Sequence, residues 1–225
     1  MGTKINELVK ESALEKLLVM AAQIHGHYCP GLALGVIAGT GGIQKMGVDS
    51  DGLEDLLAIV ETNNCFSDGI QFVTGCSFGN NALIFKDTGK IACMLVNRKG
   101  QGFRMVLKPD ARDQMHVVYP GFADTFNKVV AKGERDSSTI DTFKSEGRTK
   151  AFTVLRLDFE KLFTVEPVRN IKVPDYAPSH ESFTCTACGE STMETRGRVK
   201  DDGKYCLECA GEKVNRLTGS GINIE

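Results

Sequence analysis

Four cysteines near the C-terminus constrain the fold of this chain more than any other feature. They form two C-x-x-C pairs with seventeen residues between them, namely Cys185, Cys188, Cys206 and Cys209. Each C-x-x-C turn can direct two thiolates at one tetrahedral ion, and the intervening loop brings the second pair beside the first. A segment of about forty residues buries too little apolar surface to fold well alone. The spacing therefore predicts a ribbon over residues 183–225 in which structural zinc supplies on the order of ten kcal/mol of folding free energy.

Two other interpretations of these cysteines remain open at the sequence level. They could form a pair of disulfides, or one C-x-x-C could be a redox dithiol. Eight cysteines in a chain with no signal-like or membrane-spanning apolar segment point to metal binding, because a reducing compartment keeps thiols free. We therefore expect a soluble, cytoplasmic protein that has no membrane partner.

Charge argues against a nucleic-acid partner. The whole chain carries a formal charge of -2, and 41% of its 225 residues are apolar, enough for one substantial core and a small module. Residues 183–225 contain six Lys or Arg against seven acids. Four thiolates with one zinc ion subtract two further charges, so the ribbon would carry about -3, the wrong sign for a phosphate backbone.

The order of expected elements indicates an α+β fold, with a mixed helix and antiparallel-sheet core domain before the small zinc-ribbon domain. We expect the core domain over residues 1–165 and a polar, proline-bearing linker over 166–182. Apolar periodicity, capping residues and turn signals predict the elements of the core. The expected helices span residues 12–24, with Ser12 as N-cap, 30–39, 65–74, 110–116, 120–132 and a segment from 139 onward. A buried strand is expected over 56–61, and an antiparallel meander over 82–85, 90–97 and 102–107.

Glycines repeat every four residues in the second expected helix, at Gly31, Gly35 and Gly39. Such a stripe predicts a face on which another element can pack closely.

Soft and borderline metal ligands gather at two junctions between these elements. The first stretch holds His25, His27 and Cys29, and the second holds Cys65, Asp68, Gln71 and Cys76. Successive steps of three along a helix indicate that Cys65, Asp68 and Gln71 share a face. Thiolate and imidazole donors suit zinc, iron or a softer metal, and three protein ligands would leave one coordination position open.

Other interpretations of the same thiols stay open. Cys29 stands beside a predicted helix N-terminus, which would lower its pKa and suit a nucleophilic or persulfide-carrying thiol. Cys93 lies in an expected strand and is interpreted as a small buried apolar residue.

Two blocks of sequence carry a family resemblance. Residues 25–35, which read HGHYCPGLALG, and residues 64–76, which read NCFSDGIQFVTGC, strongly resemble the FmdE-like family, which takes its name from formylmethanofuran dehydrogenase. Residues 89–92, Asn97-Arg98, residues 102–104 and the terminal four-cysteine module are similar to the same family, so the resemblance covers nearly the whole chain.

The resemblance implies an α+β core with a metal-binding cleft, a C-terminal zinc ribbon, and a homodimer in which the ribbon lies against the partner. It implies His27, Cys65 and Cys76 as ligands of a second metal, zinc or another transition metal. His25, Cys29, Asp68, Gln71 and Thr74 would line or support that site, with His25, Gln71 and Thr74 placed to contact a cofactor of the pterin type. The family name also points to one-carbon metabolism beside molybdenum or tungsten enzymes.

Three functions are then in competition. The first is a metal-binding accessory protein of a molybdenum or tungsten oxidoreductase, handling its pterin, sulfur or metal. The second is a free-standing zinc enzyme with an open metal position, with Cys29 and Asp68 as candidate catalytic residues and Asp68 as the base. The third is a ribbon-bearing regulatory protein, which would need a basic face that the charge count does not show.

Overall fold

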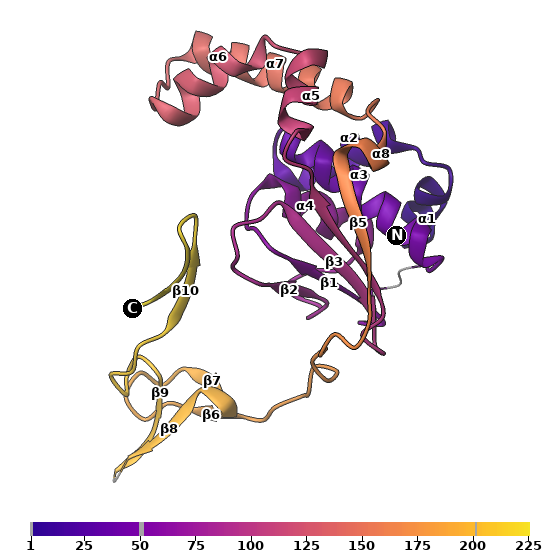
Figure 1. Cartoon of the computed structure of the whole chain (residues 1–225). Helices are drawn as coiled ribbons and strands as arrows, with labels where there is room; N and C mark the ends of the chain where they lie inside the picture. Colours follow the sequence, from indigo (N-terminus) through magenta and orange to yellow (C-terminus); the bar gives the residue numbers. More distant parts are fainter. Residues whose placement is uncertain (1, 50–51, 201) are drawn as a thin grey trace. The chain divides into compact units, whose positions relative to one another are not determined.

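The chain folds into two compact units, the first ending at Val173 and the second beginning at Pro174. The computed structural model describes residues 2–49, 52–200 and 202–225 (Figure 1). Within those ranges, no helix combines the length and the apolar character needed to cross a lipid bilayer.

A five-stranded sheet forms the centre of the first unit, with strand order β2-β1-β3-β4-β5. Its strands are β1 (Leu56–Val60), β2 (Leu83–Phe85), β3 (Ala92–Asn97), β4 (Gly102–Leu107) and β5 (Phe163–Val168). β3, β4 and β5 pair antiparallel, but β2 lies parallel to β1 on its other side. The meander expected over residues 82–107 is therefore wrong at its first strand. The helix between β1 and β2 explains the difference, because it acts as a crossover that returns the chain in the same direction.

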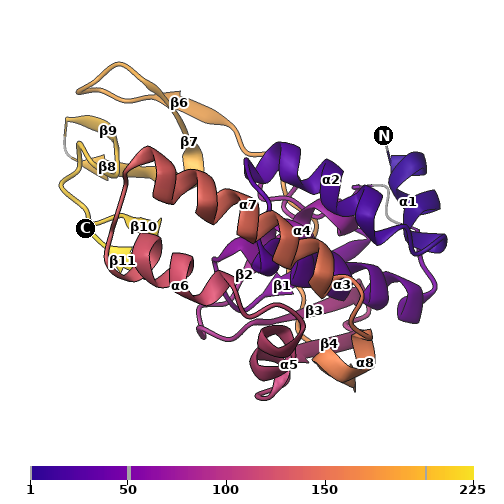
Figure 2. The ribbon, with the colours of Figure 1, turned by 90° about the horizontal axis from the view of Figure 1, so that it is seen from above.

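Helices cover this sheet and confirm the α+β class. They are α1 (Gly2–Lys10), α2 (Leu14–His25), α3 (Pro30–Met46), α4 (Cys65–Thr74), α5 (Ala111–Val118), α6 (Phe122–Phe126), α7 (Ser137–Val154) and α8 (Phe159–Leu162), with a π-helical turn at Asn127–Ala131. Figures 1 and 2 show α2, α3 and α4 together on one face of the sheet, where α4 packs on β1 and α3 on β4.

Two helix boundaries differ from the sequence-based expectation. Ser12 does not cap α2, because its backbone has a positive φ of 52° and its hydroxyl accepts a hydrogen bond from Gln44 Nε2 instead. α3 does not stop near Gly39 but continues to Met46, and Gly47 ends it with a φ of 64°. The glycines inside α3 are tolerated because tertiary packing outweighs their weak helix propensity.

That packing is the close contact between α3 and α4, as the glycine stripe predicts. A Cβ on Gly31 would lie 3.0 Å from the Cys65 Cβ, and one on Gly35 would collide with the Phe66 carbonyl oxygen. A Cβ on Gly39 would approach the Val73 side chain at 3.1 Å. The two helix backbones therefore touch, and the N-terminal turn of α4 is held against the N-terminal turn of α3.

The first unit extends beyond the boundary expected at residue 165. Residues 166–168 complete β5 by pairing with β4, with Pro167 opposite Phe103. Ile171 and Val173 pack on the core, and Ile171 N donates to Gly100 O at 3.1 Å. These residues are part of the core, because they bury apolar surface that a polar linker would leave exposed.

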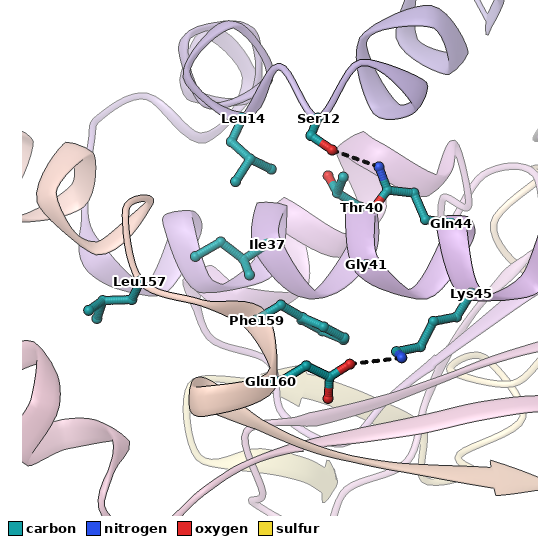
Figure 3. A pocket seen from close by; sticks show the side chains of 10 residues that line it. All are labelled: Ser12, Leu14, Ile37, Thr40, Gly41, Gln44, Lys45, Leu157, Phe159 and Glu160. Atoms are coloured by element: carbon teal, nitrogen blue, oxygen red, sulfur yellow. Dashed lines mark hydrogen bonds and ion pairs between the residues drawn. The ribbon is translucent and has the colours of Figure 1, made fainter.

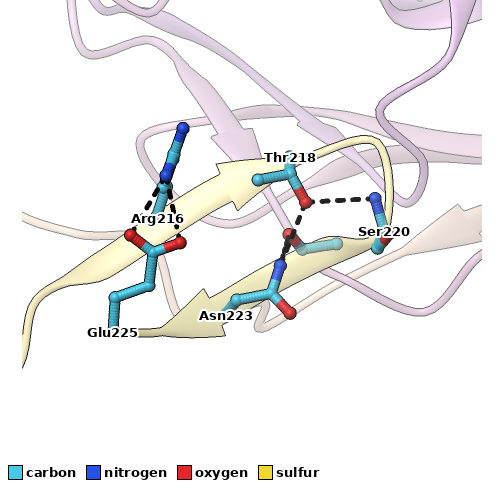
Figure 4. Close-up of polar contacts among 6 residues, drawn as sticks. Arg216, Thr218, Ser220, Asn223 and Glu225 are labelled. Atoms are coloured by element: carbon cyan, nitrogen blue, oxygen red, sulfur yellow. Dashed lines mark hydrogen bonds and ion pairs between the residues drawn. The ribbon is translucent and has the colours of Figure 1, made fainter.

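The second unit is built from short hairpins. Its strands are β6 (Ser182–Thr184), β7 (Ser191–Met193), β8 (Gly197–Lys200), β9 (Gly203–Cys206), β10 (Asn215–Thr218) and β11 (Gly221–Ile224), with a 3-10 turn at Glu194–Arg196. β10 and β11 form a final hairpin, closed by an ion pair between Arg216 and Glu225 at 3.0 Å (Figure 4). The Thr218 hydroxyl accepts from Ser220 N and Asn223 Nδ2 and so holds the turn in place.

We expect Gly35→Val to destabilise the first unit by about 1–3 kcal/mol or more, because the added side chain would force α3 and α4 apart. Urea unfolding followed by circular dichroism measures the change. Gly79→Ala is the matched control, since a Cβ there meets no atom within 4 Å. Equal stability of the two variants would contradict a backbone contact at Gly35.

Candidate metal centres

Three helix ends converge at one place in the first unit and bring four metal-binding side chains together. His25 is the last residue of α2, Cys29 is the N-cap of α3, and Cys65 is the first residue of α4. Gly26, with a φ of 88°, turns the chain out of α2 toward His27. One ligand atom from each of His25, His27, Cys29 and Cys65 lies within 4.8 Å of the others. We call these four residues the core cluster.

Helix capping explains why both thiols face the cluster. Leu32 N donates to Cys29 Sγ at 3.4 Å, so the thiol takes the place of a capping side chain. The Asn64 side chain caps α4 by accepting from Phe66 N at 3.0 Å and leaves Cys65 at the first helical position. Both sulfurs therefore lie at the positive ends of helix dipoles, which favour a thiolate.

Asp68 orients one of the two imidazoles. Its Oδ2 lies 2.7 Å from His25 Nδ1, and His25 Nε2 lies 3.6 Å from Cys29 Sγ. A carboxylate can only accept, so Nδ1 carries the proton and the lone pair of Nε2 faces the cluster. A carboxylate behind a ligating histidine is the usual second partner in zinc sites. Asp68 is therefore a positioning residue for His25.

The pKa values of the cluster favour a metal ligand set. The hydrogen bond from Cys29 lowers the pKa of Cys65 to about 6, assisted by the nearby His25 charge. The same contact with Cys65, together with burial, raises the pKa of Cys29. Burial first, and then the charge of His25, lowers the pKa of His27. The thiolate at neutral pH is thus Cys65, and the depressed pKa expected for Cys29 is wrong because its neighbour takes the negative charge first.

Cys76 lies apart from the core cluster, so its expected role as a ligand beside His27 and Cys65 is wrong. It follows the C-terminus of α4, and a helix of that length separates its two ends by about 15 Å. Its Sγ donates to Leu56 O at 3.2 Å, and burial raises its pKa to about 11. Cys76 is a buried neutral thiol in this structure, as Cys93 is in β3.

Gln71 and Thr74 are also outside the cluster. Gln71 is six residues beyond Cys65 in α4, or about 9 Å along the helix axis. The Thr74 hydroxyl donates to Ile70 O at 2.7 Å and accepts from Cys76 N, so it secures the end of α4. The structure replaces the expected three-ligand set by four donors, and His25 and Cys29 take the places given to Cys76 and an open position.

The second unit holds the four-cysteine cluster that the spacing predicts. The sulfurs of Cys185, Cys188, Cys206 and Cys209 lie within 4.8 Å of one another, and all four are free thiols. Each pair forms the same turn, with Gly189 N donating to Cys185 O and Ala210 N to Cys206 O, both at 2.9 Å. Backbone N–H groups of Cys188 and Cys206 lower the pKa of Cys185 to about 6. This geometry fits one tetrahedral zinc ion.

A hollow of about 380 Å³ lies at the other half of α3 (Figure 3). Its walls include Ile37, Thr40 and Phe159, and an ion pair between Lys45 and Glu160 at 2.8 Å crosses its rim. No cysteine or histidine lines it among the described residues. The donors suited to metal chemistry are therefore concentrated in the core cluster and the ribbon.

Family comparison divides the chain in the same way. Residues 24–164 match the family described as "FmdE, Molybdenum formylmethanofuran dehydrogenase operon". Residues 180–214 match the prokaryotic dksA/traR C4-type zinc finger. The second match and the four-cysteine geometry support a structural zinc ion in the ribbon.

Two relatives extend the comparison. A probable S-adenosyl-L-methionine-binding protein of Archaeoglobus fulgidus is 38% identical over 221 residues, which are 94% of this chain but 57% of that protein. The chain thus spans little more than half the length of this relative. A solved structure of an FmdE-like protein of tungsten formylmethanofuran dehydrogenase, from Syntrophus aciditrophicus, has a TM-score of 0.56 and 20% identity, covering 88% of this chain and 92% of that one. It shows that the two proteins share a fold.

In metal-free protein, we expect Cys65 to be alkylated by iodoacetamide with a half-maximal rate near pH 6, the approximate pKa of its thiol. The rate should rise as the pH increases through that value, because only the thiolate reacts. Peptide mass spectrometry separates Cys65 from the ribbon cysteines, and buried Cys93 is the internal control. A midpoint near the ordinary thiol value would contradict activation by Cys29 and His25.

We expect Cys185→Ser to unfold the second unit and leave the first unit folded, because zinc supplies on the order of ten kcal/mol to such a module. Heteronuclear NMR measures this as collapse of amide dispersion for residues 182–224 only. Collapse throughout residues 2–173 as well would show that the first unit depends on the ribbon.

Proposed function

The chain belongs to the FmdE family, named for formylmethanofuran dehydrogenase, and from this we propose that it is a metal-binding accessory protein of a molybdenum or tungsten oxidoreductase. Its core cluster would hold one zinc ion or another transition metal, in addition to the structural zinc of the ribbon. The observation that carries the proposal is the convergence of His25, His27, Cys29 and Cys65 within 4.8 Å.

The chemistry of these donors supports a metal. Two sulfurs and two imidazole nitrogens match the ligand preference of zinc, and all four can approach one tetrahedral ion. The low pKa of Cys65 supplies a thiolate, and the lowered pKa of His27 keeps that imidazole neutral with a free lone pair. Asp68 already holds His25 in the tautomer that a metal requires. When bound, such an ion would supply Lewis acidity at the rim of the first unit.

The accessory role is supported by the operon association in the family description. The cysteine inventory agrees with it. Four of the eight thiols belong to the ribbon, two belong to the core cluster, and Cys76 and Cys93 are buried neutral thiols. This leaves no four-cysteine set for an iron–sulfur cluster, so an electron-carrying role has no support. The homodimer and the molybdenum or tungsten partner enzyme stay predictions.

A zinc-dependent enzyme is the second candidate, and one observation favours it. A groove of about 510 Å³ reaches the core cluster and includes His27 in its wall. A volume of that size suits a small substrate. An enzyme would require one cluster donor to leave the metal and give its place to substrate or water, and His27 is the donor that faces this groove.

Metal stoichiometry tests the proposal directly. Elemental analysis of untagged protein, purified without added metal, should find about two metal ions per chain in the wild type and about one in Cys65→Ser. Cys76→Ala is the matched control and should keep both, because its thiol lies at the far end of α4. Full metal content in Cys65→Ser, with a folded first unit, would sink the core metal site.

A further inference from the structure

The groove beside the core cluster joins three parts of the first unit. It is lined by the end of α2, by the loop that contains Gly26, His27 and Tyr28, and by one face of α7. Because His27 belongs to both the groove and the core cluster, a molecule in the groove would lie next to a metal held by that cluster. This inference rests on the proposed metal site and identifies the ligand that would approach it.

Positive charge dominates the walls. Lys144, Ser145 and Arg148 of α7 face the groove, and no carboxylate lines it among the described residues. The charge of Lys144 is felt at His27, since it helps to lower the pKa of that imidazole. The nearest acid, Asp68, is already engaged by His25 Nδ1. The groove therefore presents an electropositive surface beside the cluster.

The two cations are placed for a ligand and not for helix stability. Lys144 and Arg148 are four residues apart on α7, a spacing at which like charges repel and destabilise a helix. An anion between them would remove that repulsion. The groove therefore gives a reason for a pair that the fold alone does not explain.

Arg148 is also held in position. Its guanidinium lies 4.6 Å from the centre of the Tyr28 ring and 5.4 Å from that of Phe152. Stacking on aromatic faces occupies the plane of the guanidinium and leaves its N–H edge available for two parallel hydrogen bonds to a carboxylate or phosphate. The side chain thus loses little further freedom when it binds an anion.

The backbone of the groove is rigid for similar reasons. A Cβ on Gly147 would lie 3.1 Å from the Tyr28 carbonyl oxygen, so α7 packs directly on the cluster loop. Asp136 caps the start of α7 by accepting from Thr139 N at 3.0 Å. Both contacts hold the cationic face of α7 against His27 before any ligand arrives.

We propose that this groove binds the anionic group of a small molecule, a carboxylate or a phosphate, with Arg148 and Lys144 as its ligands and the core cluster at its inner end. The two sources of negative charge share this recognition chemistry. Inorganic phosphate and acetate are the simplest probes that separate them.

Binding of each probe to the full chain is measured by titration calorimetry and by amide shifts at Gly26 and Ser145, with metal content determined on every sample. We expect saturable binding of at least one probe, weakened about tenfold or more in Arg148→Gln and in Lys144→Gln, since a charge-assisted hydrogen bond is lost. Raising the salt concentration should weaken it further. Lys4→Gln in α1 is the charge-matched control and should bind as the wild type does.

The outcomes separate this proposal from the proposed function. Binding that survives in both groove variants, or that falls equally in Lys4→Gln, overturns the groove as the site, even where two metals per chain are present. No saturable binding of either probe to protein with both metals also overturns it. Binding by Arg148 in a sample with only the ribbon metal would support the groove and contradict the core metal site.

Discussion

The backbone contact between α3 and α4 is the interaction on which the rest of the first unit depends. Glycine at positions 31 and 35 lets the two helices approach until the Cβ of Cys65 and the carbonyl of Phe66 fill the space where side chains would be. This contact sets the N-terminus of α4 beside that of α3. Cys29 and Cys65 are far apart in the sequence, and without this approach they would not share a site. The glycines therefore weaken helix propensity in exchange for a functional geometry.

Cysteines in this chain behave differently according to their surroundings. Cys76 and Cys93 are held among apolar neighbours that raise their thiol pKa, so they remain neutral and pack as small apolar side chains. Cys65 stands at a helix N-terminus beside a second thiol and an imidazole, which lower its pKa to about 6. Position relative to helix ends, and not cysteine content, decides which thiols are suited to bind a metal.

The two cysteine clusters also differ in what surrounds them. The ribbon sulfurs are enclosed by short hairpins and receive hydrogen bonds from backbone N–H groups, such as Cys206 N to Cys185 Sγ at 3.3 Å. The core cluster opens through His27 onto a groove lined by Lys144 and Arg148. A closed set of thiolates suits a structural ion, whereas a site with an open wall suits one that meets another molecule.

The sequence by itself determined what is local. C-x-x-C spacing identified the ribbon, because each pair of ligands lies within one turn of chain, and apolar periodicity located α2 and α4 within a few residues. Tertiary structure decided which ends meet. Cys76 failed as a cluster ligand because α4 is a straight helix that carries it away from Cys65. Strand β2 joined the sheet beside β1 because α4 serves as a crossover, and Lys144 and Arg148 reached His27 only through the packing of α7 on Tyr28. Such contacts depend on the distance between elements in space, which no short-range pattern records.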